Sequence, residues 1–582
     1  MDYLAKKAAW LSSPSVSAEM KDEIGKADDA TWKEMFSSDL HFGTAGMRAL
    51  MGPGSARLNA LTVRRATIGV AKFLLGRYPK EARERGVAIS FDNRHHSLEF
   101  RDVAAKVLRE HGIKVYTFHE PHPTPELSYA VRHLHCVGGL MITASHNPKQ
   151  YNGYKFYDEK GCQGVYETID GLIDIIEKLP DELSVTYEPV AETEKGALVY
   201  LDEDERFDQE YLAKELSTSY YFHYFRGERK TKIVFSPECG CDSKVGPALL
   251  RMAGYEVTTV PGQDFFDPDF SGTKNPNPET PEAYEGAEKT LKELQAQGKK
   301  YALIEVTDPD ADRCGIAFVN RNGEIQRFTG NQTGALLIDF VLSTRKKRNE
   351  LPEDGVVCDT FVTGGQGEKV ASLYGVKVRT TATGFKYIGN MADQIESAGE
   401  TFLFGYEESY GYLLADFVRD KDSLQSILAI ADMTEYYLRQ GKTLDVAYEE
   451  LCARTGEYYD TQYNVYFQGP SALSQMNEQL EKLRKETRKT IGPKTVKTVT
   501  DYEKRTVLNV ESGTLLPLTA PDIDVSNCIR FDFKEGGFIA IRPSGTEPKV
   551  KFYVEVVRRP LSLAKKEADQ IDLDLEKSMG LK

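Results

Sequence analysis

The sequence predicts an α/β protein with mainly parallel sheets, followed by a smaller α+β domain at its C-terminal end. Three observations lead to this prediction. The chain has 582 residues, enough for several hydrophobic cores, because the buried fraction rises with chain length. Strand and helix patterns alternate from about residue 60 to about residue 440, and strands joined by crossover helices form parallel sheets. After about residue 455 this alternation ends.

Three segments carry the alternation of strands and helices. The first has helical patterns at 61–75 and 98–112 and apolar strands at 86–92 and 113–120. The second has strands at 231–238, 255–260 and 301–308 and helices at 245–254 and 284–298. The third has strands at 354–362 and 401–408, with helices after Gly330, at 368–375 and at 423–440. Each segment predicts one α/β domain.

The C-terminal part has a different pattern of predicted elements. A tyrosine-rich stretch and a charged helical pattern precede two strands, and these elements lie at 458–469, 478–492, 536–543 and 549–557. Such a mixture is typical of an α+β domain. We therefore expect four domains with the boundaries 1–208, 209–322, 323–453 and 454–582.

The composition excludes several classes of protein. Hydrophobic residues make up 40% and charged residues 28% of the chain, as in folded globular proteins. The net charge of −15 argues against a general affinity for nucleic acid, which requires many basic side chains. No apolar run approaches the ~18 residues of a membrane span, and the first ten residues lack the apolar core of a signal peptide. Eight scattered cysteines indicate reduced thiols. We expect a cytoplasmic protein; the sequence identifies no partner protein.

The first loop with chemical interest is 143–155, TASHNPKQYNGYK, which follows the apolar strand 137–143. Ser145 therefore lies just past the carboxyl end of a strand, where open α/β sheets bind ligands. The loop has no Gly-x-Ser-x-Gly frame, so a hydrolase nucleophile elbow is excluded. Alone, a Ser-His-Asn-Pro sequence is most often an ordinary turn, so this loop indicates catalysis only together with other motifs.

A second loop, DPDADR, places Asp308, Asp310 and Asp312 at alternate positions after an apolar strand. In an extended segment these three side chains would point to the same side. Hard oxygen ligands of this kind suit Mg2+, which often shares its coordination with a phosphate. Arg313 and Val319 do not fit a calcium-binding EF-hand loop. An aspartyl-phosphate nucleophile and a solvated acidic turn remain alternatives to a metal site.

The third loop, GYEESYG, contains Glu407 and Ser409 after a strand. Their oxygens could bind the hydroxyl groups of a sugar. The tip of an acidic hairpin is an equally good interpretation of this loop alone.

The fourth loop, RPSGTEPK, lies between the last two predicted strands. Arg542 offers a planar fork for phosphate, and the loop adds hydroxyl and backbone N–H donors at Ser544, Gly545 and Thr546. A Ser-Gly hairpin turn is the alternative. The density of donors favours a phosphate-binding loop.

In this order, the four loops resemble those of the α-D-phosphohexomutase superfamily, which contains phosphoglucomutases and phosphomannomutases. FGTAGMR at 42–48, Asp92-x-Arg94, TGFKYIG at 383–389 and RDKDS at 419–423 match further landmarks of the family. The resemblance spans nearly the whole chain, and so many ordered motifs do not arise together by chance.

The resemblance implies four domains around a central cleft. It implies that Ser145 carries a phosphate, and that this phosphate and Asp308, Asp310 and Asp312 hold Mg2+. It also implies interconversion of glucose 1-phosphate and glucose 6-phosphate through glucose 1,6-bisphosphate, which must turn end for end without escaping.

The family pattern also implies roles for further residues. Arg313 would draw charge from the phosphate, Lys155 would act as the general base, and Arg48 would give electrostatic support. His146 would orient the serine loop. The remaining residues would contact the substrate: Glu407 and Ser409 at the hydroxyls, Lys386 and Lys421 at hydroxyl or phosphate, and Arg542, Ser544, Gly545 and Thr546 at the distal phosphate.

Two departures from the commoner family pattern concern substrate choice. Tyr406 precedes Glu407, and the serine loop carries extra polar bulk after Pro148. Both resemble the subgroup of certain bacterial phosphoglucomutases and phosphopentomutase-like enzymes. Glucose phosphate is therefore the first expectation, with mannose phosphate and pentose phosphates as alternatives. A bisphosphate synthase, a phosphatase and a non-catalytic sugar-phosphate sensor are remoter alternatives.

Overall fold

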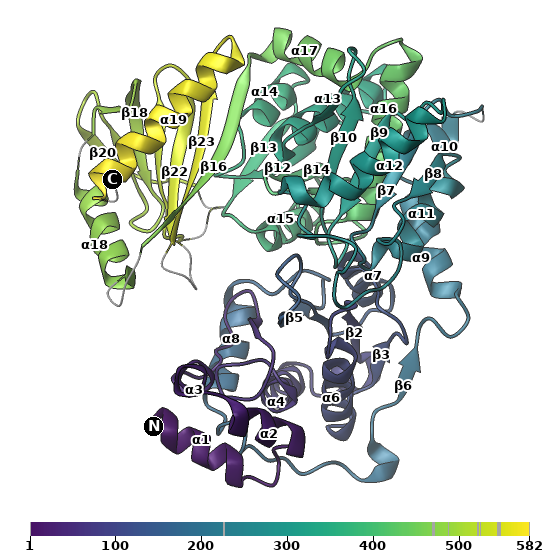
Figure 1. Ribbon diagram of the computed structural model, residues 1–582, viewed down its shortest axis with the longest axis vertical. Coiled ribbons are helices and arrows are strands. Elements are labelled where there is room, and N and C mark those ends of the chain that lie inside the picture. The colour runs from purple at the N-terminus through teal and green to yellow at the C-terminus, as the bar shows by residue number, and fades with distance from the viewer. Residues whose placement is uncertain are drawn as a thin grey trace. The chain divides into compact units, whose positions relative to one another are not determined.

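The computed structural model describes residues 2–224, 227–467, 472–486, 488–520, 523, 525–543 and 549–580. The chain forms two compact units (Figure 1). The first comprises 1–327, 392–397 and 411–441, and the second comprises 328–391, 398–410 and 442–582.

Three helices precede the first predicted element. They are α1 (Tyr3–Ser12), α2 (Ala18–Lys26) and α3 (Asp29–Phe36). They enclose a small core around Trp10, with Ile24, Met35 and Phe36. Ser17 and Asp28 cap the second and third helix through hydrogen bonds from backbone N–H groups. The sequence analysis did not anticipate these helices.

The first sheet has the strand order β1-β5-β4-β2-β3-β6. Its strands are β1 (Met47–Leu50), β2 (Val87–Phe91), β3 (Val115–Thr117), β4 (Gly138–Ile142), β5 (Tyr151–Asp158) and β6 (Leu198–Tyr200). Strands β4, β2, β3 and β6 are parallel to one another, whereas β5 and β1 add an antiparallel edge beside β4. The accompanying helices are α4 (Ala60–Arg77), α5 (Glu81–Arg85), α6 (Ser97–Glu110), α7 (Thr124–His133) and α8 (Tyr166–Glu177). Helix α4 packs against α6 and α8, and α7 packs against β2 and β4.

The second sheet of this unit has the order β11-β10-β9-β7-β8. Its strands are β7 (Lys232–Ser236), β8 (Glu256–Thr259), β9 (Leu303–Thr307), β10 (Cys314–Val319) and β11 (Ile325–Arg327). The parallel part is β9-β7-β8, and β10 returns antiparallel to β9. The helices are α9 (Arg206–Leu216), α10 (Tyr220–Tyr224), α11 (Asp242–Met252), α12 (Glu285–Ala296) and α16 (Ser423–Arg439). Helix α16 packs against α11 and β9.

The second unit begins with a three-stranded parallel arrangement, β13-β12-β14. These strands are β12 (Gly355–Thr360), β13 (Lys377–Thr381) and β14 (Thr401–Glu407), and β15 (Gly411–Leu413) follows in the chain. The helices of this region are α13 (Gly330–Lys347), α14 (Gln366–Leu373), α15 (Phe385–Ser397) and α17 (Leu444–Thr455). Helix α13 packs against α14, α17 and β14.

The C-terminal sheet is antiparallel, with the order β16-β23-β22-β21-β18-β19-β20 and β17 paired with β18. Its strands are β16 (Tyr458–Tyr466), β17 (Thr490–Ile491), β18 (Lys494–Asp501), β19 (Thr506–Asn509), β20 (Thr514–Pro517), β21 (Ile529–Phe533), β22 (Gly537–Pro543) and β23 (Lys549–Val557). The helices are α18 (Ala472–Lys485) and α19 (Leu561–Ser578). The predicted fold class, mainly parallel α/β sheets before a sheet-rich C-terminal domain, is confirmed. The four domain boundaries and the central cleft stay predictions.

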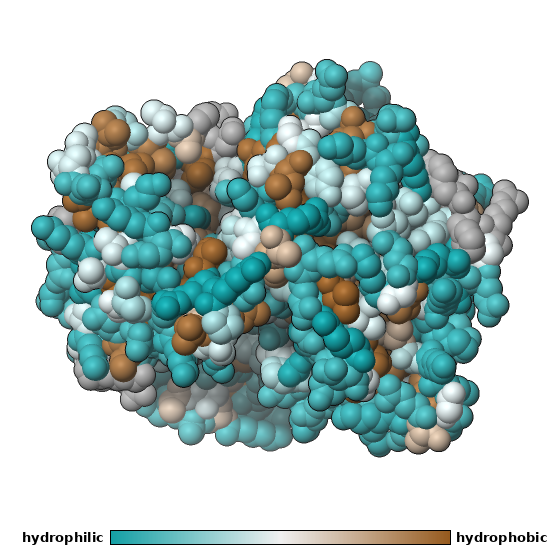
Figure 2. Space-filling view, turned by 90° about the horizontal axis from the view of Figure 1, so that it is seen from above, coloured by the Kyte–Doolittle hydropathy of each residue, from teal (hydrophilic) through white to brown (hydrophobic). Residues whose placement is uncertain are grey.

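Hydrophilic residues dominate the face drawn in Figure 2, where hydrophobic residues lie in small scattered groups. Such scattered apolar residues are ordinary on a folded protein's surface. Among the described residues, no helix is both long and apolar enough to cross a membrane.

Candidate active site around Ser145 and three aspartates

Ser145 lies in the turn between β4 and β5, at the carboxyl edge of the parallel strands, as the sequence predicts. Its side chain is buried, and its backbone has a φ of 53°, an uncommon left-handed conformation for a residue with a side chain. The backbone N–H donates to Thr143 Oγ1 at 2.8 Å. The hydroxyl donates to Asp308 Oδ2 at 2.9 Å, and its oxygen lies 3.2 Å from His146 Nδ1. The turn therefore aims the hydroxyl at the aspartate loop.

Arg94 holds the serine turn in place. Its guanidinium donates to the backbone carbonyls of Ser145, Asn147, Pro148 and Tyr151. The same buried group pairs with Asp92 at 3.1 Å. The sequence analysis identified Asp92-x-Arg94 only as a landmark, because the spacing does not reveal which carbonyls the guanidinium reaches.

Asp308, Asp310 and Asp312 converge as predicted, but the physical reason differs from the expected extended segment. After β9 the chain makes a tight turn, in which Ala311 has a φ of 58°. The Asp308 carboxylate accepts hydrogen bonds from the N–H groups of Asp312 and Arg313, which closes this turn. All three aspartates are almost completely buried, and each offers an oxygen within 4.8 Å of the others.

The electrostatics of this cluster favour a cation. Burial, together with the negative charges of Asp310 and Asp312, raises the pKa of Asp308 well above its usual value. Burial also opposes the ionisation of Asp310, but Lys155 and Lys421 hold its pKa below the usual range. The buried atoms Asp310 Oδ1 and Asp312 Oδ1 accept no hydrogen bond from the described residues. Three buried carboxylates with unused oxygens fit a hard divalent cation.

Two lysines contact the aspartate cluster. Lys155, on β5, lies 3.2 Å from Asp310 Oδ2 and is buried. Lys421 lies 2.9 Å from Asp312 Oδ2 and 3.3 Å from Asp420. These contacts bring two predicted substrate or proton-handling residues to the predicted metal loop.

Arg48 lies on β1, which pairs with the strand after the serine turn, and Arg313 directly follows the aspartate turn, one residue before β10. Arg48, on β1, donates to Asn147 Oδ1 at 3.1 Å, so it contacts the serine turn. Arg313 follows Asp312 and forms an ion pair with Glu279. Arg48 therefore lies beside the serine turn and Arg313 beside the aspartate turn, and their predicted roles stay predictions.

His146 follows the serine and is held as a neutral imidazole. Burial, and secondarily the positive charges of Arg313 and Arg48, lower its pKa well below the usual value. Because the Ser145 hydroxyl donates its one hydrogen to Asp308, a neutral ring that carries its hydrogen on Nδ1 can donate it to the Ser145 oxygen. The orienting role of His146 stays a prediction, and this contact is the geometry on which it depends.

Thr124 is a site residue that the sequence analysis missed. Its N–H donates to the backbone carbonyl of Asp310 at 2.9 Å, and its hydroxyl lies 3.1 Å from Asp310 Oδ2. Thr124 begins α7, so the N-terminus of a helix faces a buried carboxylate, a favourable arrangement. Its sequence, His-Pro-Thr-Pro, carries only the signal of a helix start.

In the second unit, Glu407 ends β14 and is buried. Its Oε1 accepts a hydrogen bond from the N–H of Gly384, in the TGFKYIG segment, at 2.8 Å. Lys386 is two residues further along, in the first turn of α15. Ser409 lies in the turn after β14. The structure thus joins the sugar loop to the segment that carries Lys386.

Tyr406 does not face the sugar loop. Its ring is buried against Gly334 and Gly367, and its hydroxyl donates to Gly364 O at 3.2 Å. Because successive side chains of a strand point to opposite faces, Tyr406 points away from Glu407. The contribution of Tyr406 to substrate choice stays a prediction, and any such effect would act through the packing of β14 against α13 and α14.

Arg542 lies near the end of β22 and is half-buried. The other predicted phosphate-loop residues, Ser544, Gly545 and Thr546, lie outside the described residues. The prediction of a phosphate loop therefore rests on the sequence.

At the carboxyl edge of the parallel strands, a buried serine hydroxyl contacts a cluster of carboxylates, and lysine and arginine side chains border both. This is the arrangement of a phosphoryl-transfer enzyme. Comparison with known proteins identifies the family. Four models of the phosphoglucomutase/phosphomannomutase family match the chain: the α/β/α domains I, II and III at residues 39–182, 210–322 and 329–455, and the C-terminal domain at 479–573. The chain belongs to the phosphoglucomutase/phosphomannomutase family, as its motifs predict.

The relatives agree with this assignment. The phosphoglucomutase of Staphylococcus haemolyticus is 36% identical over 90% of this chain and 91% of its own. That of Staphylococcus aureus strain USA300 is 33% identical over 94% and 95%. Among solved structures, Paramecium parafusin in its open form has a TM-score of 0.66 at 17% identity over 94% of this chain and 96% of its own. A family member from Burkholderia thailandensis has a TM-score of 0.63 at 18% identity over 91% and 96%. The two structures support the fold.

Proposed function

We propose that this protein is a phosphoglucomutase that interconverts α-D-glucose 1-phosphate and glucose 6-phosphate through phosphorylated Ser145 and a glucose 1,6-bisphosphate intermediate. The observation that carries the proposal is the hydrogen bond of 2.9 Å from the Ser145 hydroxyl to the buried Asp308 carboxylate. The two staphylococcal phosphoglucomutases named above match this chain over nearly their whole length, and they support the choice of glucose phosphate.

We infer that Asp308, Asp310, Asp312 and the Ser145 phosphate hold Mg2+. The donor set is entirely oxygen, and two of its buried oxygens accept no hydrogen bond from the described residues. Bound Mg2+ would neutralise negative charge on the phosphoryl group.

The reaction divides into two transfers. A sugar hydroxyl attacks the phosphorus on Ser145 and the bond from phosphorus to Ser145 Oγ breaks. The proton of the attacking hydroxyl passes to a base, which returns it to Ser145 Oγ as the serine leaves. We assign this role to Lys155, whose Nζ lies 3.2 Å from Asp310 Oδ2. Because arginine stays protonated, Arg48 and Arg313 would stabilise charge instead. After the bisphosphate turns end for end, its other phosphate returns to Ser145 by the reverse step. His146 would orient the hydroxyl between the transfers.

The remaining assignments concern substrate binding. Glu407 and Ser409 would bind sugar hydroxyls, and Lys386 and Lys421 would contact hydroxyl or phosphate. Arg542, Ser544, Gly545 and Thr546 would bind the phosphate that is not reacting. The family motifs support these roles, which the substitutions below test.

The first experiment follows glucose 6-phosphate and free phosphate from glucose 1-phosphate, with Mg2+ and a trace of glucose 1,6-bisphosphate. We expect rapid formation of glucose 6-phosphate, loss of at least a thousandfold in kcat for Ser145→Ala, and loss of activity with EDTA that Mg2+ restores. Faster turnover of mannose or pentose phosphates would overturn the choice of glucose. Release of free phosphate would identify a phosphatase, and no turnover of any sugar phosphate would identify a sensor.

A further inference from the structure

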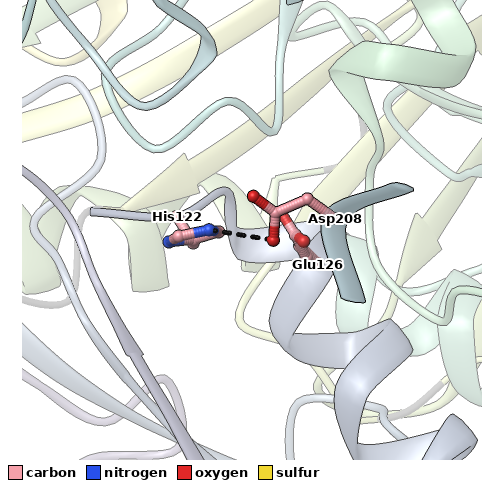
Figure 3. A group of neighbouring side chains, drawn as sticks. All are labelled: His122, Glu126 and Asp208. Atoms are coloured by element: carbon pink, nitrogen blue, oxygen red, sulfur yellow. Dashed lines mark ion pairs between the residues drawn. The ribbon is translucent and has the colours of Figure 1, made fainter. Parts of the chain in front are cut away.

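A second cluster of metal-ligating side chains lies in the first unit, and the proposed reaction uses none of them. His122 precedes α7, Glu126 is in the first turn of α7, and Asp208 is in the first turn of α9 (Figure 3). His122 Nε2 lies 3.3 Å from Asp208 Oδ1. One ligand atom from each residue lies within 4.8 Å of the other two. Two helices from different parts of the chain thus meet at this cluster.

The imidazole of His122 is oriented like a metal ligand. Its Nδ1 lies 2.9 Å from the backbone carbonyl of Glu120, which can only accept, so Nδ1 carries a hydrogen. The ring stacks on Phe118 with a centroid distance of 4.0 Å, and the backbone N–H of His122 donates to Phe91 O. Metal-bound histidines commonly donate their other ring nitrogen to such a carbonyl. Nε2 is thereby turned toward the two carboxylates.

Glu126 supplies independent evidence for a ligand. Its side chain is 0% exposed, and neither carboxylate oxygen has a hydrogen-bond partner among the described residues. Asp208 Oδ1, which is also buried, has the His122 ring as its partner at 3.3 Å. The charges that act most strongly on Glu126 are His122 and the carboxylates of Asp208, Asp422 and Asp202. One imidazole therefore faces several carboxylates, and a buried carboxylate without a partner is costly.

We propose that His122 Nε2, Glu126 and Asp208 bind a divalent transition-metal ion, Zn2+ in the first instance, at a site distinct from the Asp308 cluster. A nitrogen with two carboxylates suits Zn2+, whereas Mg2+ prefers oxygen ligands alone. Ligands about 2.0–2.1 Å from a tetrahedral ion are roughly 3.4 Å apart, so small side-chain rotations close the observed cluster. The Asp208 side chain is 23% exposed, which lets water complete the coordination. The ion would fasten α7 to α9.

The test isolates this site by removing the Asp308 cluster as a zinc ligand. Asp310→Asn protein is stripped with EDTA, loaded with ZnCl2, desalted and analysed for zinc by mass spectrometry. We expect one zinc ion per chain. Asp310→Asn combined with Asp208→Asn should bind zinc at least tenfold more weakly, because a carboxylate ligand is replaced by a neutral amide. Zinc should raise the Tm of the first protein and leave that of the second unchanged.

A matched control exists on the same two helices. His133 of α7 lies 3.3 Å from Glu210 of α9, and no described residue supplies a third ligand there. Adding Glu210→Gln to Asp310→Asn should therefore leave zinc binding unchanged. Glu126→Gln, which keeps the shape of a buried side chain, provides a second variant should Asp208→Asn fold poorly. The proposal is overturned if Asp310→Asn retains no zinc, which would leave His122 as a protonated partner of Asp208, or if neither Asp208→Asn nor Glu126→Gln weakens binding.

Discussion

Arg94 illustrates how one buried side chain fixes the reacting hydroxyl without contacting it. The guanidinium satisfies four carbonyls of the serine turn and is neutralised by Asp92. A lysine would retain the charge, but its single ammonium cannot reproduce the planar set of donors. Arg94 is therefore a positioning residue, and a substitution that keeps its positive charge should still lower kcat.

We expect Arg94→Lys to lower kcat at least tenfold, because the serine turn loses most of its hydrogen bonds. Arg94→Ala should lower the free energy of unfolding by about 3–5 kcal/mol, since it leaves Asp92 buried without its partner. The control is Arg101→Lys, another buried arginine of the first unit, which donates to Phe118 O. This control should lose stability and keep kcat. Equal losses of kcat in both lysine variants would contradict the positioning role.

Glu238 gives a prediction about pH. Burial raises its pKa to about 8, although a hydrogen bond from Ser236 opposes the shift. The folded protein therefore keeps a proton that the unfolded chain has lost above about pH 4.5. This glutamate consequently makes stability fall as pH rises from about 4.5 to about 8, by up to ~1.4 kcal/mol per pH unit.

Glu238→Gln should remove this dependence, because the amide does not ionise. Near pH 4.5 the wild-type protein and the variant should unfold at similar denaturant concentrations. By pH 8 the variant should be more stable than the wild type by a few kcal/mol. Denaturant titrations at pH 4.5, 6 and 8 measure this difference, and a constant difference across the three values would refute the assignment.

At the level of loops and strands, close backbone approach positions the metal loop. A Cβ on Gly240 would lie 2.5 Å from Pro309 Cα and 2.6 Å from Pro309 O, inside the Asp308–Asp312 turn. The N–H of Cys241 also donates to Pro309 O. The backbone of Gly240 and Cys241 thus packs directly against the acidic turn.

Gly240→Ala should displace the acidic turn, since backbone atoms cannot move aside as a flexible side chain can. We expect kcat and the affinity for Mn2+, used as a probe of the Mg2+ site, each to fall at least tenfold. Gly76→Ala is the control, because its Cβ meets nothing within 4 Å and lies in helix α4; it should be neutral or stabilise by about 1 kcal/mol. Unchanged Mn2+ affinity in Gly240→Ala would contradict this account.

The sequence predicted the elements with strong periodicity, among them α4, β2, α6 and β9. It missed α1 to α3, whose 8–10 residues give weak periodic signals and whose small core forms around Trp10. It placed the three aspartates together for the wrong reason, because a left-handed residue such as Ala311 leaves no mark in the pattern. The sequence analysis did not predict the cluster of His122, Glu126 and Asp208. Glu126 and Asp208 are 82 positions apart in the chain, and only tertiary packing brings them together.

Across the whole molecule, the proposed functions divide between the two compact units. Ser145, Lys155 and the aspartate cluster belong to the first, whereas Glu407 and Arg542 belong to the second. Phosphoryl chemistry and metal binding should therefore respond to substitutions in the first unit. Sugar recognition should respond to substitutions in the second, with Lys421 of the first unit as the exception.

Glu407→Gln tests this division. The amide loses charge-assisted hydrogen bonds to sugar hydroxyls, each worth about 1.5–3 kcal/mol, so kcat/KM for glucose 1-phosphate should fall roughly 10- to 150-fold. The affinity of the aspartate cluster for Mn2+ should stay within twofold of the wild type, because the substituted carboxylate belongs to the other unit. Asp310→Asn should give the opposite pattern and lose Mn2+ affinity at least tenfold. Isothermal titration with Mn2+, paired with the coupled mutase assay, separates the two effects. Should Glu407→Gln weaken Mn2+ binding as strongly as Asp310→Asn, sugar recognition and metal binding could not be assigned to separate units.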